Sequence, residues 1–571
     1  MKGNIITYSK NEKMKCSKKI KVRVKNLDRT FELEQYTQLT DVLSLVEKEL
    51  GFKPINATIN NVTLPLDETL HESCEVNFMG LEYDSAGRTY FRTLFMILSK
   101  ALSELFPTRK LIAEHSVSRG YYATVTEMES FTKENINQLK EKALQIIQED
   151  HPITREVVPT EEVIRRAKLK GLQPIVDLLE TTGSLYTTIH KIGDYADVCN
   201  ETLMTHTGAV YLFDLIPFLD GILIRVPDKN DPSHLAPMVL QQKMQNVIKE
   251  QDRLLAMLGL SWVGSVNKAI LSGKVKEMIQ VSEALQEKQI AGIASRIAMR
   301  YQEGVRLVLI SGPSSSGKTT FTNRLKTQLL TNFIRPYMIS LDDYFIEREH
   351  TPLDEEGNYD FESLYALDLD LFSEDMERLM RGETVAIPTY NFVTGKREYI
   401  EGKELTLQDG DILMLEGIHA LNPELLPNVD PRKLYKVYVS ALTALGIDEH
   451  NPISTTSHRL LRRIIRDHSF RGYTARDTIE AWHRVRRGED RWVFPYQEYS
   501  DDMFNSSMVY EMAVIRPIAE PLLLDVPEGV PEYTEARRLL KLLRYNRIIP
   551  SSEIPRASLL REFVGGSVFY S

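Results

Sequence analysis

The sequence predicts a multidomain α/β and α+β protein, in which a C-terminal α/β domain with a parallel sheet follows smaller mixed domains. A chain of 571 residues is too long for one hydrophobic core and suggests about three to four domains. Three short apolar segments, at 306–310, 336–345 and 412–421, are typical of buried strands. A glycine- and serine-rich turn joins the first of them to a helix, which favours a parallel α/β arrangement.

Changes in pattern divide the chain into six segments. They are a lysine-rich tail expected to be disordered (1–17), a β-grasp domain (18–80), an α+β domain (82–235), a helical connector (236–300), an α/β domain (301–530), and a C-terminal helix with its tail (531–571). Residues 535–550 predict a basic amphipathic helix that packs on the α/β domain through Leu539, Leu540, Leu542 and Leu543. Contact of this helix with a membrane or RNA is the alternative.

Composition limits the class of protein. Apolar residues make up 42% and charged residues 26%, as in soluble globular proteins. The net charge of −10 argues against a general nucleic-acid binder. Cys16, Cys74 and Cys199 lie far apart, so no disulfide framework is expected, and a reducing cytoplasm fits. We expect neither a membrane span nor a signal peptide, because no long apolar run occurs and the N-terminus is polar.

The segment 18–80 has the element order of a β-grasp domain. Residues 19–25 and 31–37 predict strands, 39–50 a helix, and 57–65 and 74–80 further strands. The leucine-rich helix and the strands around it resemble the ubiquitin-like TGS domain at the front of threonyl-tRNA synthetases.

The segment 82–235 resembles the second additional, editing-type domain of threonyl- and alanyl-tRNA synthetases. It has an amphipathic helix at 92–107, then SRGYYATV and a long helix around 134–150. That family holds a metal with an H-x-x-x-H pair and a later Cys and His. Here the corresponding positions are Arg92, Met96, Cys199 and Leu203, so three of the four ligands are missing. We expect a scaffold without metal chemistry, in which His115 and His206 are ordinary histidines.

The stretch SGPSSSGKTT at 311–320 matches G-x-x-x-x-G-K-[ST], the phosphate-binding loop. Its backbone N–H groups and the following helix N-terminus would face phosphate oxygens. Lys318 would reach the β- and γ-phosphates, and the hydroxyl of Thr319 would bind Mg²⁺. We therefore predict ATP and Mg²⁺ as cofactors. The predicted nucleotide-binding residues in the loop are Gly312, Ser315, Ser316, Gly317, Lys318, Thr319 and Thr320.

Two carboxylates follow apolar strands. Asp342 ends the strand at 336–345, next to the phosphate loop, where it could accept a hydroxyl proton. Glu416 lies in the strand at 412–421 and could hold the Mg²⁺ shell.

Residues 458–491 contain ten arginines, no lysine and five acidic residues. Leu460, Leu461, Ile464 and Ile465 form an apolar stripe with arginines around it. Arginine without lysine favours bidentate phosphate contacts, and a solvated helix face paired with acidic residues elsewhere is the alternative.

Six motifs in order, SGPSSSGKTT, SLDDYF, NYDF, IPTYNFVTGKR, LEGIHAL and RRIIRDHSFRG, resemble the uridine kinase/phosphoribulokinase family of P-loop kinases over about 300–520. The resemblance implies that Asp342 is the general base, with the neighbouring Asp343 as a second candidate for this role and as a substrate-binding residue. It implies that Asp360 binds ribose hydroxyls and that Tyr390 packs near the base. The implied lid arginines, which clamp the triphosphate and the transferring group, are Arg463, Arg466 and Arg471.

The predicted reaction is transfer of the γ-phosphoryl group to a small-molecule hydroxyl, foremost the 5′-hydroxyl of a nucleoside such as uridine or cytidine. The family's base-reading histidine is replaced by Gly395, which puts uridine specificity in doubt. A sugar phosphate or pantothenate as acceptor stays open, as does an ATP-switched regulator that binds RNA or tRNA. Preference for ATP over GTP and the oligomeric state are not legible in the sequence.

Overall fold

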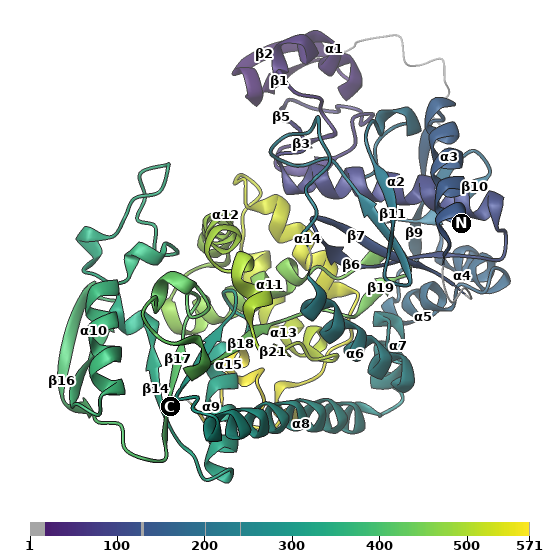
Figure 1. The fold of residues 1–571 in the computed structure, drawn as a ribbon. Coiled ribbons are helices and arrows are strands. Elements are labelled where there is room, and N and C mark those ends of the chain that lie inside the picture. The colour runs from purple at the N-terminus through teal and green to yellow at the C-terminus, as the bar shows by residue number, and fades with distance from the viewer. Residues whose placement is uncertain (1–17, 127–130, 200, 240, 570–571) are drawn as a thin grey trace, which may run out of the picture. The chain divides into compact units, whose positions relative to one another are not determined.

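The computed structural model describes residues 18–569, apart from 127–130, 200 and 240. The predicted disorder of the tail therefore lies outside the described residues, as does Cys16. The chain forms two compact units (Figure 1). The first takes in the described part of 1–170, with 184–239 and 527–534; the second takes in 171–183, 240–526 and 535–571. The finer six-segment division stays a prediction.

The first unit contains a five-stranded sheet followed by smaller sheets and helices. Its elements are β1 (Lys19–Val24), β2 (Arg29–Glu34), α1 (Leu39–Leu50), β3 (Asn56–Ile59), β4 (Val62–Leu64), β5 (Cys74–Met79), α2 (Asp84–Leu105), β6 (Leu111–Val117), β7 (Gly120–Val125), α3 (Lys133–Gln148), β8 (Ile153–Pro159), α4 (Thr160–Leu169), β9 (Tyr186–Ile192), β10 (Tyr195–Val198), β11 (Asp214–Phe218) and β12 (Gly221–Arg225).

The five-stranded sheet has the order β2-β1-β5-β3-β4. Strand β1 runs antiparallel to β2 and parallel to β5. Alternation along β1 turns Ile20, Val22 and Val24 into the core, where they meet Val42 and Val46 of α1. The strand–strand–helix–strand–strand order follows from this patterning, while assignment of the sheet to the β-grasp class stays a prediction.

The positions that correspond to metal ligands in editing-type domains lie in an apolar environment. Met96, Cys199 and Leu203 belong to one buried cluster with the helices α2 and α3. Burial raises the pKa of the Cys199 thiol to about 11. Arg92 on α2 pairs with Glu201 at 3.6 Å. In the structure this thiol therefore lies among apolar side chains, with an arginine nearby.

The second unit contains the parallel sheet and most of the helices. Its elements are α5 (Gln173–Thr182), α6 (Gln242–Leu258), α7 (Val263–Leu271), α8 (Val275–Gln302), β13 (Leu307–Ser311), α9 (Lys318–Thr331), β14 (Arg335–Ser340), α10 (Leu369–Met380), β15 (Val385–Asn391), β16 (Lys396–Leu405), β17 (Asp411–Glu416), β18 (Leu434–Ser440), β19 (Gly446–Asp448), β20 (Asn451–Pro452), α11 (Thr455–Arg471), α12 (Ala475–Trp492), β21 (Asp502–Asn505), α13 (Glu511–Leu524), α14 (Tyr533–Arg544) and α15 (Arg561–Val564).

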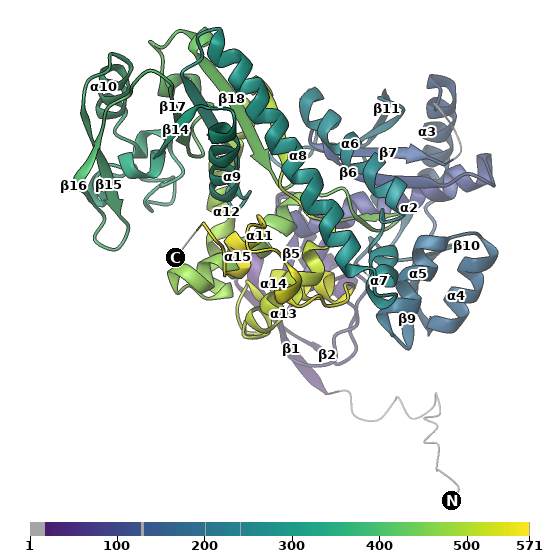
Figure 2. The same cartoon turned by 90° about the horizontal axis from the view of Figure 1, so that it is seen from below.

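The sheet has the order β14-β17-β13-β18-β21, and all of its neighbouring strands are parallel. Helices α8 and α9 lie side by side and contribute to the core on one face (Figure 2). The other face packs against α10 and the turn that follows β14. Strands β15 and β16 form a separate antiparallel ribbon at the edge of the unit (Figure 1). Both faces are covered, as the near-continuous apolar strands predict.

Two segments of this unit are largely helical in the structure. Helices α6, α7 and α8 follow one another in the segment expected to be a connector. In α14 the predicted leucines, Leu539, Leu540, Leu542 and Leu543, are buried. Among the described residues no helix combines the length and hydropathy that a membrane crossing requires.

Candidate active site at the carboxyl edge of the parallel sheet

The ends of three parallel strands bring the predicted motifs together. In the sheet register, Glu416 at the end of β17 lies opposite Ile310 of β13 and Ser340 of β14. The phosphate loop follows β13, and Asp342 lies in a short 3-10 turn directly after β14. Because carboxyl ends of parallel strands share one edge of a sheet, the loop and both carboxylates meet there.

The backbone of the phosphate loop has a conformation that requires its glycines. A Cβ added at Gly312 would lie 1.9 Å from the carbonyl oxygen of Val439 on β18, so only glycine fits. Gly317 caps α9 with a φ of 84°, in the left-handed region. Ser315 also has a positive φ, of 57°. The loop is thus held tightly against the sheet in a shape that turns it toward the start of α9.

The polar groups of the loop fit a bound phosphate chain. Among the described residues, the hydroxyls of Ser315 and Ser316 are buried without a hydrogen-bond partner. The ammonium of Lys318 is buried and donates to the carbonyls of Gly312, at 2.9 Å, and Pro313. The two buried hydroxyls without a partner are costly to the fold unless a ligand meets them. Thr319, the next residue of the loop motif, is half-buried.

The carboxylates of the site influence one another. Burial raises the pKa of Glu416 to about 7; Lys318 opposes this shift, and Asp342 adds to it. Surrounding protein also raises the pKa of Asp342, although its residue keeps a surface open to solvent. Here Lys318 is the main opposing charge, followed by Arg471 and Arg466. Both carboxyls are therefore more basic than a free one, as a proton acceptor requires.

A third carboxylate, Glu362, was not found from the sequence. Burial raises its pKa to about 7, against the influence of Arg463. Its backbone lies so close to α12 that a Cβ added at Gly488 would be 2.3 Å from the Cβ of Glu362. Its only signal in the sequence was its place two residues after Asp360, whose Oδ1 accepts from the Glu362 N–H at 3.1 Å.

Aromatic rings gather beside these carboxylates. Tyr390 on β15 lies 5.5 Å from Phe345 and 5.1 Å from Phe392, between ring centroids. Phe361, next to Asp360, lies 6.3 Å from Phe345. The ring centroid of Tyr359 lies 6.0 Å from that of Phe361, so Tyr359 belongs to the same aromatic group. Phe361, Tyr359 and Phe392 are partly exposed and can meet a ligand.

Asp343 ties this group to the turn after β14. Its Oδ1 accepts a hydrogen bond from the N–H of Tyr390 at 3.2 Å. Burial raises the pKa of Asp343, and the hydrogen bond from the Tyr390 N–H opposes this shift. The structure thus brings Asp342, Asp343 and Tyr390 into one place, and Asp360 adjoins the same aromatic group.

The three predicted lid arginines share one buried carboxylate. Arg463 donates to Asp467 at 3.1 Å, and Arg466 does so at 3.2 Å. Arg471 pairs with the same residue at 3.3 Å. Arg463 also donates to the hydroxyl of Ser314 in the phosphate loop at 2.7 Å. Burial and the neighbouring arginines lower the pKa of Arg466 to about 10, so excess positive charge is concentrated beside the loop.

Two further arginines of α11 hold the loop from behind. Arg459 donates to the Ser314 carbonyl at 3.1 Å and to Glu489 at 2.7 Å, and Glu489 accepts from the Ser314 N–H. Arg462 donates to the Ser315 carbonyl at 3.4 Å and forms an ion pair with Glu511. Both arginines are at most 1% exposed. They position the loop, so part of the arginine run is neither a phosphate contact nor a solvated face.

Gly395 stands at the position of the family's base-reading histidine, and the side chain of Arg348 occupies the space beside it. Gly395 has a φ of 70°, and its added Cβ would lie 2.8 Å from the side chain of Arg348. Arg348 donates its backbone N–H to the Gly395 carbonyl at 2.9 Å and its guanidinium to the Phe392 carbonyl. A side chain at 395 would therefore meet both strain and Arg348.

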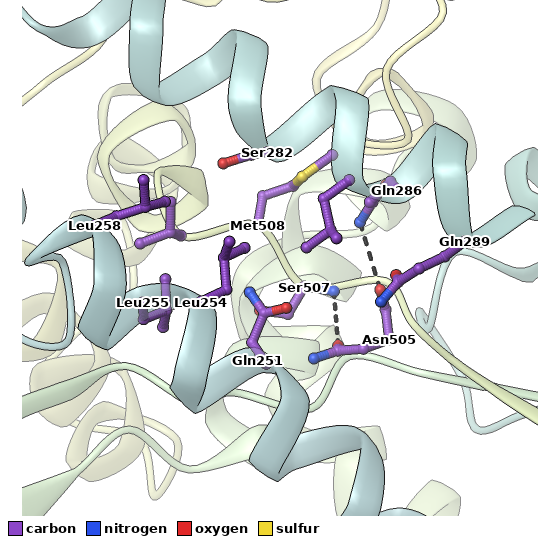
Figure 3. Close-up of a pocket in the computed structure, with 12 residues that line it drawn as sticks. Gln251, Leu254, Leu255, Leu258, Ser282, Gln286, Gln289, Asn505, Ser507 and Met508 are labelled. Atoms are coloured by element: carbon purple, nitrogen blue, oxygen red, sulfur yellow. Dashed lines mark hydrogen bonds between the residues drawn. The ribbon is translucent and has the colours of Figure 1, made fainter.

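Two other features of the described chain lie apart from these residues. A small pocket between α6, α8 and residues 505–509 is lined by Leu255, Gln286 and Met508 among others, and by none of the predicted site residues (Figure 3). The side chains of Glu347, Glu349 and His350 could approach one cation, but they are largely exposed. Neither contributes to the edge of the sheet.

The model of the phosphoribulokinase/uridine kinase family matches residues 307–513. Uridine kinases of Staphylococcus aureus, strains JH9 and Newman, are 28% identical to this chain over 196 residues, which covers 34% of this chain and 84% of each relative.

Two solved structures are also similar. One is a putative fructose transport system kinase from Silicibacter sp. TM1040, with 16% identity, a TM-score of 0.28 and coverage of 36% of this chain and 95% of that one. The other is a possible uridine kinase from Bacillus stearothermophilus, with 18% identity, a TM-score of 0.26 and coverage of 38% and 100%.

The family model begins at β13 and ends in α13, so it takes in the phosphate loop, the carboxylates and the lid arginines described above. Residues 307–513 are a phosphoribulokinase/uridine kinase family domain, and this part of the chain is a kinase of that family.

Proposed function

We propose that the second unit transfers the γ-phosphoryl group of ATP to the 5′-hydroxyl of a nucleoside. The observation that carries this proposal is the meeting of a phosphate loop, a basic carboxylate and an aromatic group at one sheet edge. The partly exposed rings of Phe361 and Phe392 offer faces on which a planar base can stack.

In this proposal each residue has a separate role. Asp342 accepts the proton of the acceptor hydroxyl as its oxygen bonds to the γ-phosphorus, and the bond from that phosphorus to the bridging oxygen breaks so that ADP leaves. Lys318, with Arg463 and Arg466, neutralises charge on the transferring group. Arg471 contributes to the same positive field. Helices α11 and α12 close over the site and exclude water.

The remaining predicted residues hold the two substrates. The loop from Gly312 to Thr320 binds the phosphates of ATP, and Asp360, Asp343 and Tyr390 bind the acceptor. Thr319 and Glu416 would hold Mg²⁺, which supplies charge neutralisation on the phosphate oxygens when bound.

The front of the chain enters the proposal as two domains. The sheet order of the first supports a TGS-like β-grasp domain, and the apolar surroundings of Cys199 support an editing-type scaffold without metal chemistry. Their present role, an RNA or tRNA partner, the oligomeric state and a cytoplasmic location stay predictions.

The test is ADP formation by the purified full chain with a panel of acceptors. The panel contains uridine, cytidine, adenosine and guanosine, together with sugar phosphates and pantothenate, each with ATP and with GTP. We expect a nucleoside to drive ADP formation and Asp342→Asn to abolish it while ATP still binds. Turnover with a sugar phosphate or pantothenate alone would contradict the nucleoside assignment and leave the residue roles standing.

A further inference from the structure

The C-terminal segment of the chain lies on the start of the phosphate-loop helix. Glu562, in the short helix α15, accepts a hydrogen bond from the backbone N–H of Thr320 at 3.0 Å and another from its hydroxyl at 2.8 Å. Thr320 is the third residue of α9 and is fully buried. A carboxylate of the chain itself thus accepts hydrogen bonds from two donors of the phosphate-loop motif, the N–H and the hydroxyl of Thr320.

Two neighbours of Glu562 fasten the segment to the loop. Leu559 fills the space over Gly317, where an added Cβ would lie 2.5 Å from its side chain. Phe563 is fully buried under the guanidinium of Arg462, whose carbon lies 4.8 Å from the ring centroid. Arg462 also reaches the carbonyl of Ser315. The segment thus contacts the loop at Gly317 and Thr320 and is linked to Ser315 through Arg462.

The negative charge of Glu562 lies at the start of α9, where the negatively charged phosphates of a nucleotide would lie. It acts on Glu416, whose pKa is raised chiefly by burial and further by Glu562, and on Arg466. The free N–H groups in the first turn of a helix are the donors with which phosphate loops bind anions. An anionic ligand at Thr320 and the carboxylate of Glu562 would compete for the same two donors and repel each other.

We propose that residues 551–564 form an autoinhibitory cap, in which Glu562 occupies an anion position that the phosphates of the nucleotide take when they bind. The inference rests on the proposed function, because it needs the loop to bind a nucleotide. Opening of the cap is then coupled to nucleotide binding, and each weakens the other. A helix cap with no such competition would stabilise α9 and leave nucleotide affinity unchanged.

The test compares Glu562→Gln with the matched control Glu553→Gln, which removes an exposed carboxylate of the same segment. Affinity for MgATP and for inorganic tripolyphosphate is measured by calorimetric titration of the full chain. We expect Glu562→Gln to tighten both about ten-fold, since an amide oxygen can keep the two hydrogen bonds but holds them more weakly and carries no charge that repels the ligand. The control should change both affinities less than about two-fold. Unchanged or weaker binding by Glu562→Gln would overturn the proposal.

A measurement on the unchanged protein guards against a variant that misfolds. Hydrogen exchange of residues 551–564 is followed with and without saturating MgATP, and with adenosine, which has no phosphate. The cap predicts faster exchange with MgATP alone, and unchanged or slower exchange overturns it. If neither the wild type nor Glu562→Gln binds MgATP, the proposed function fails as well. If both bind it equally, only the cap fails.

Discussion

Replacement of Gly312 by alanine tests the geometry of the phosphate loop most sharply. The added Cβ would lie 1.9 Å from the Val439 carbonyl oxygen and 3.0 Å from the Ser316 hydroxyl. Val439 belongs to β18, which is paired on both sides, so its backbone cannot withdraw. Ordinary contact requires more than about 3 Å, so the loop must move by about 1 Å. A displacement of that size at a reacting centre costs about a hundred-fold in rate.

The assay is kcat/KM for ADP formation with the best acceptor of the panel, together with a thermal unfolding scan. The control is Gly292→Ala in α8 of the same unit, where the added Cβ meets only the end of Arg296 at 3.5 Å. We expect a loss of about a hundred-fold for Gly312→Ala and none for the control. A folded Gly312→Ala protein that keeps its activity within a few-fold would show that the loop tolerates a side chain at position 312.

Three further outcomes follow from the site. Asp342→Asn should lower kcat by about 10²–10⁴ without loss of MgATP binding. Because the surrounding protein raises the pKa of Asp342 and a base acts deprotonated, wild-type kcat/KM should fall as the pH drops through that raised pKa. A rate that stays flat between about pH 8 and pH 5 would contradict the role of Asp342. Glu489→Ala leaves Arg459 buried and unpaired, and should cost about 3–5 kcal/mol in urea unfolding; a cost under about 1 kcal/mol would show that the pair does not hold the loop. Gly395→His should lower the free energy of unfolding by about 1–2 kcal/mol, because the φ at this position is positive. The variant should not raise the preference for uridine over adenosine, measured as a ratio of kcat/KM values, because Arg348 already fills the space beside position 395.

The edge of the parallel sheet could be predicted from the sequence because its signals are local. Each strand is a short apolar run, and each chemical group lies at the end of such a run or directly after it. Parallel strands then bring Lys318, Asp342 and Glu416 to one edge without further information. The same locality gave the helical connector and the inward leucines of α14.

The supports of the site could not be predicted, because they depend on partners far apart in the chain. An arginine in a helical pattern looks the same whether it meets phosphate or a buried acid. Only the fold shows that Arg459 meets Glu489 and that Arg462 meets Glu511. The contact between Thr320 and Glu562 spans most of the second unit's sequence, and no periodicity announces it.

In the function proposed above, the second unit moves a phosphoryl group to a hydroxyl of a small molecule. The most direct measurement follows ATP labelled in the γ-phosphate with ³²P, incubated with the full chain, Mg²⁺ and uridine or another acceptor of the panel. We predict label on the 5′-oxygen of a nucleoside, and at least about a hundred-fold less label there with Asp342→Asn. Label found solely in inorganic phosphate, whatever acceptor is present, would contradict it and make the protein an ATP-hydrolysing switch.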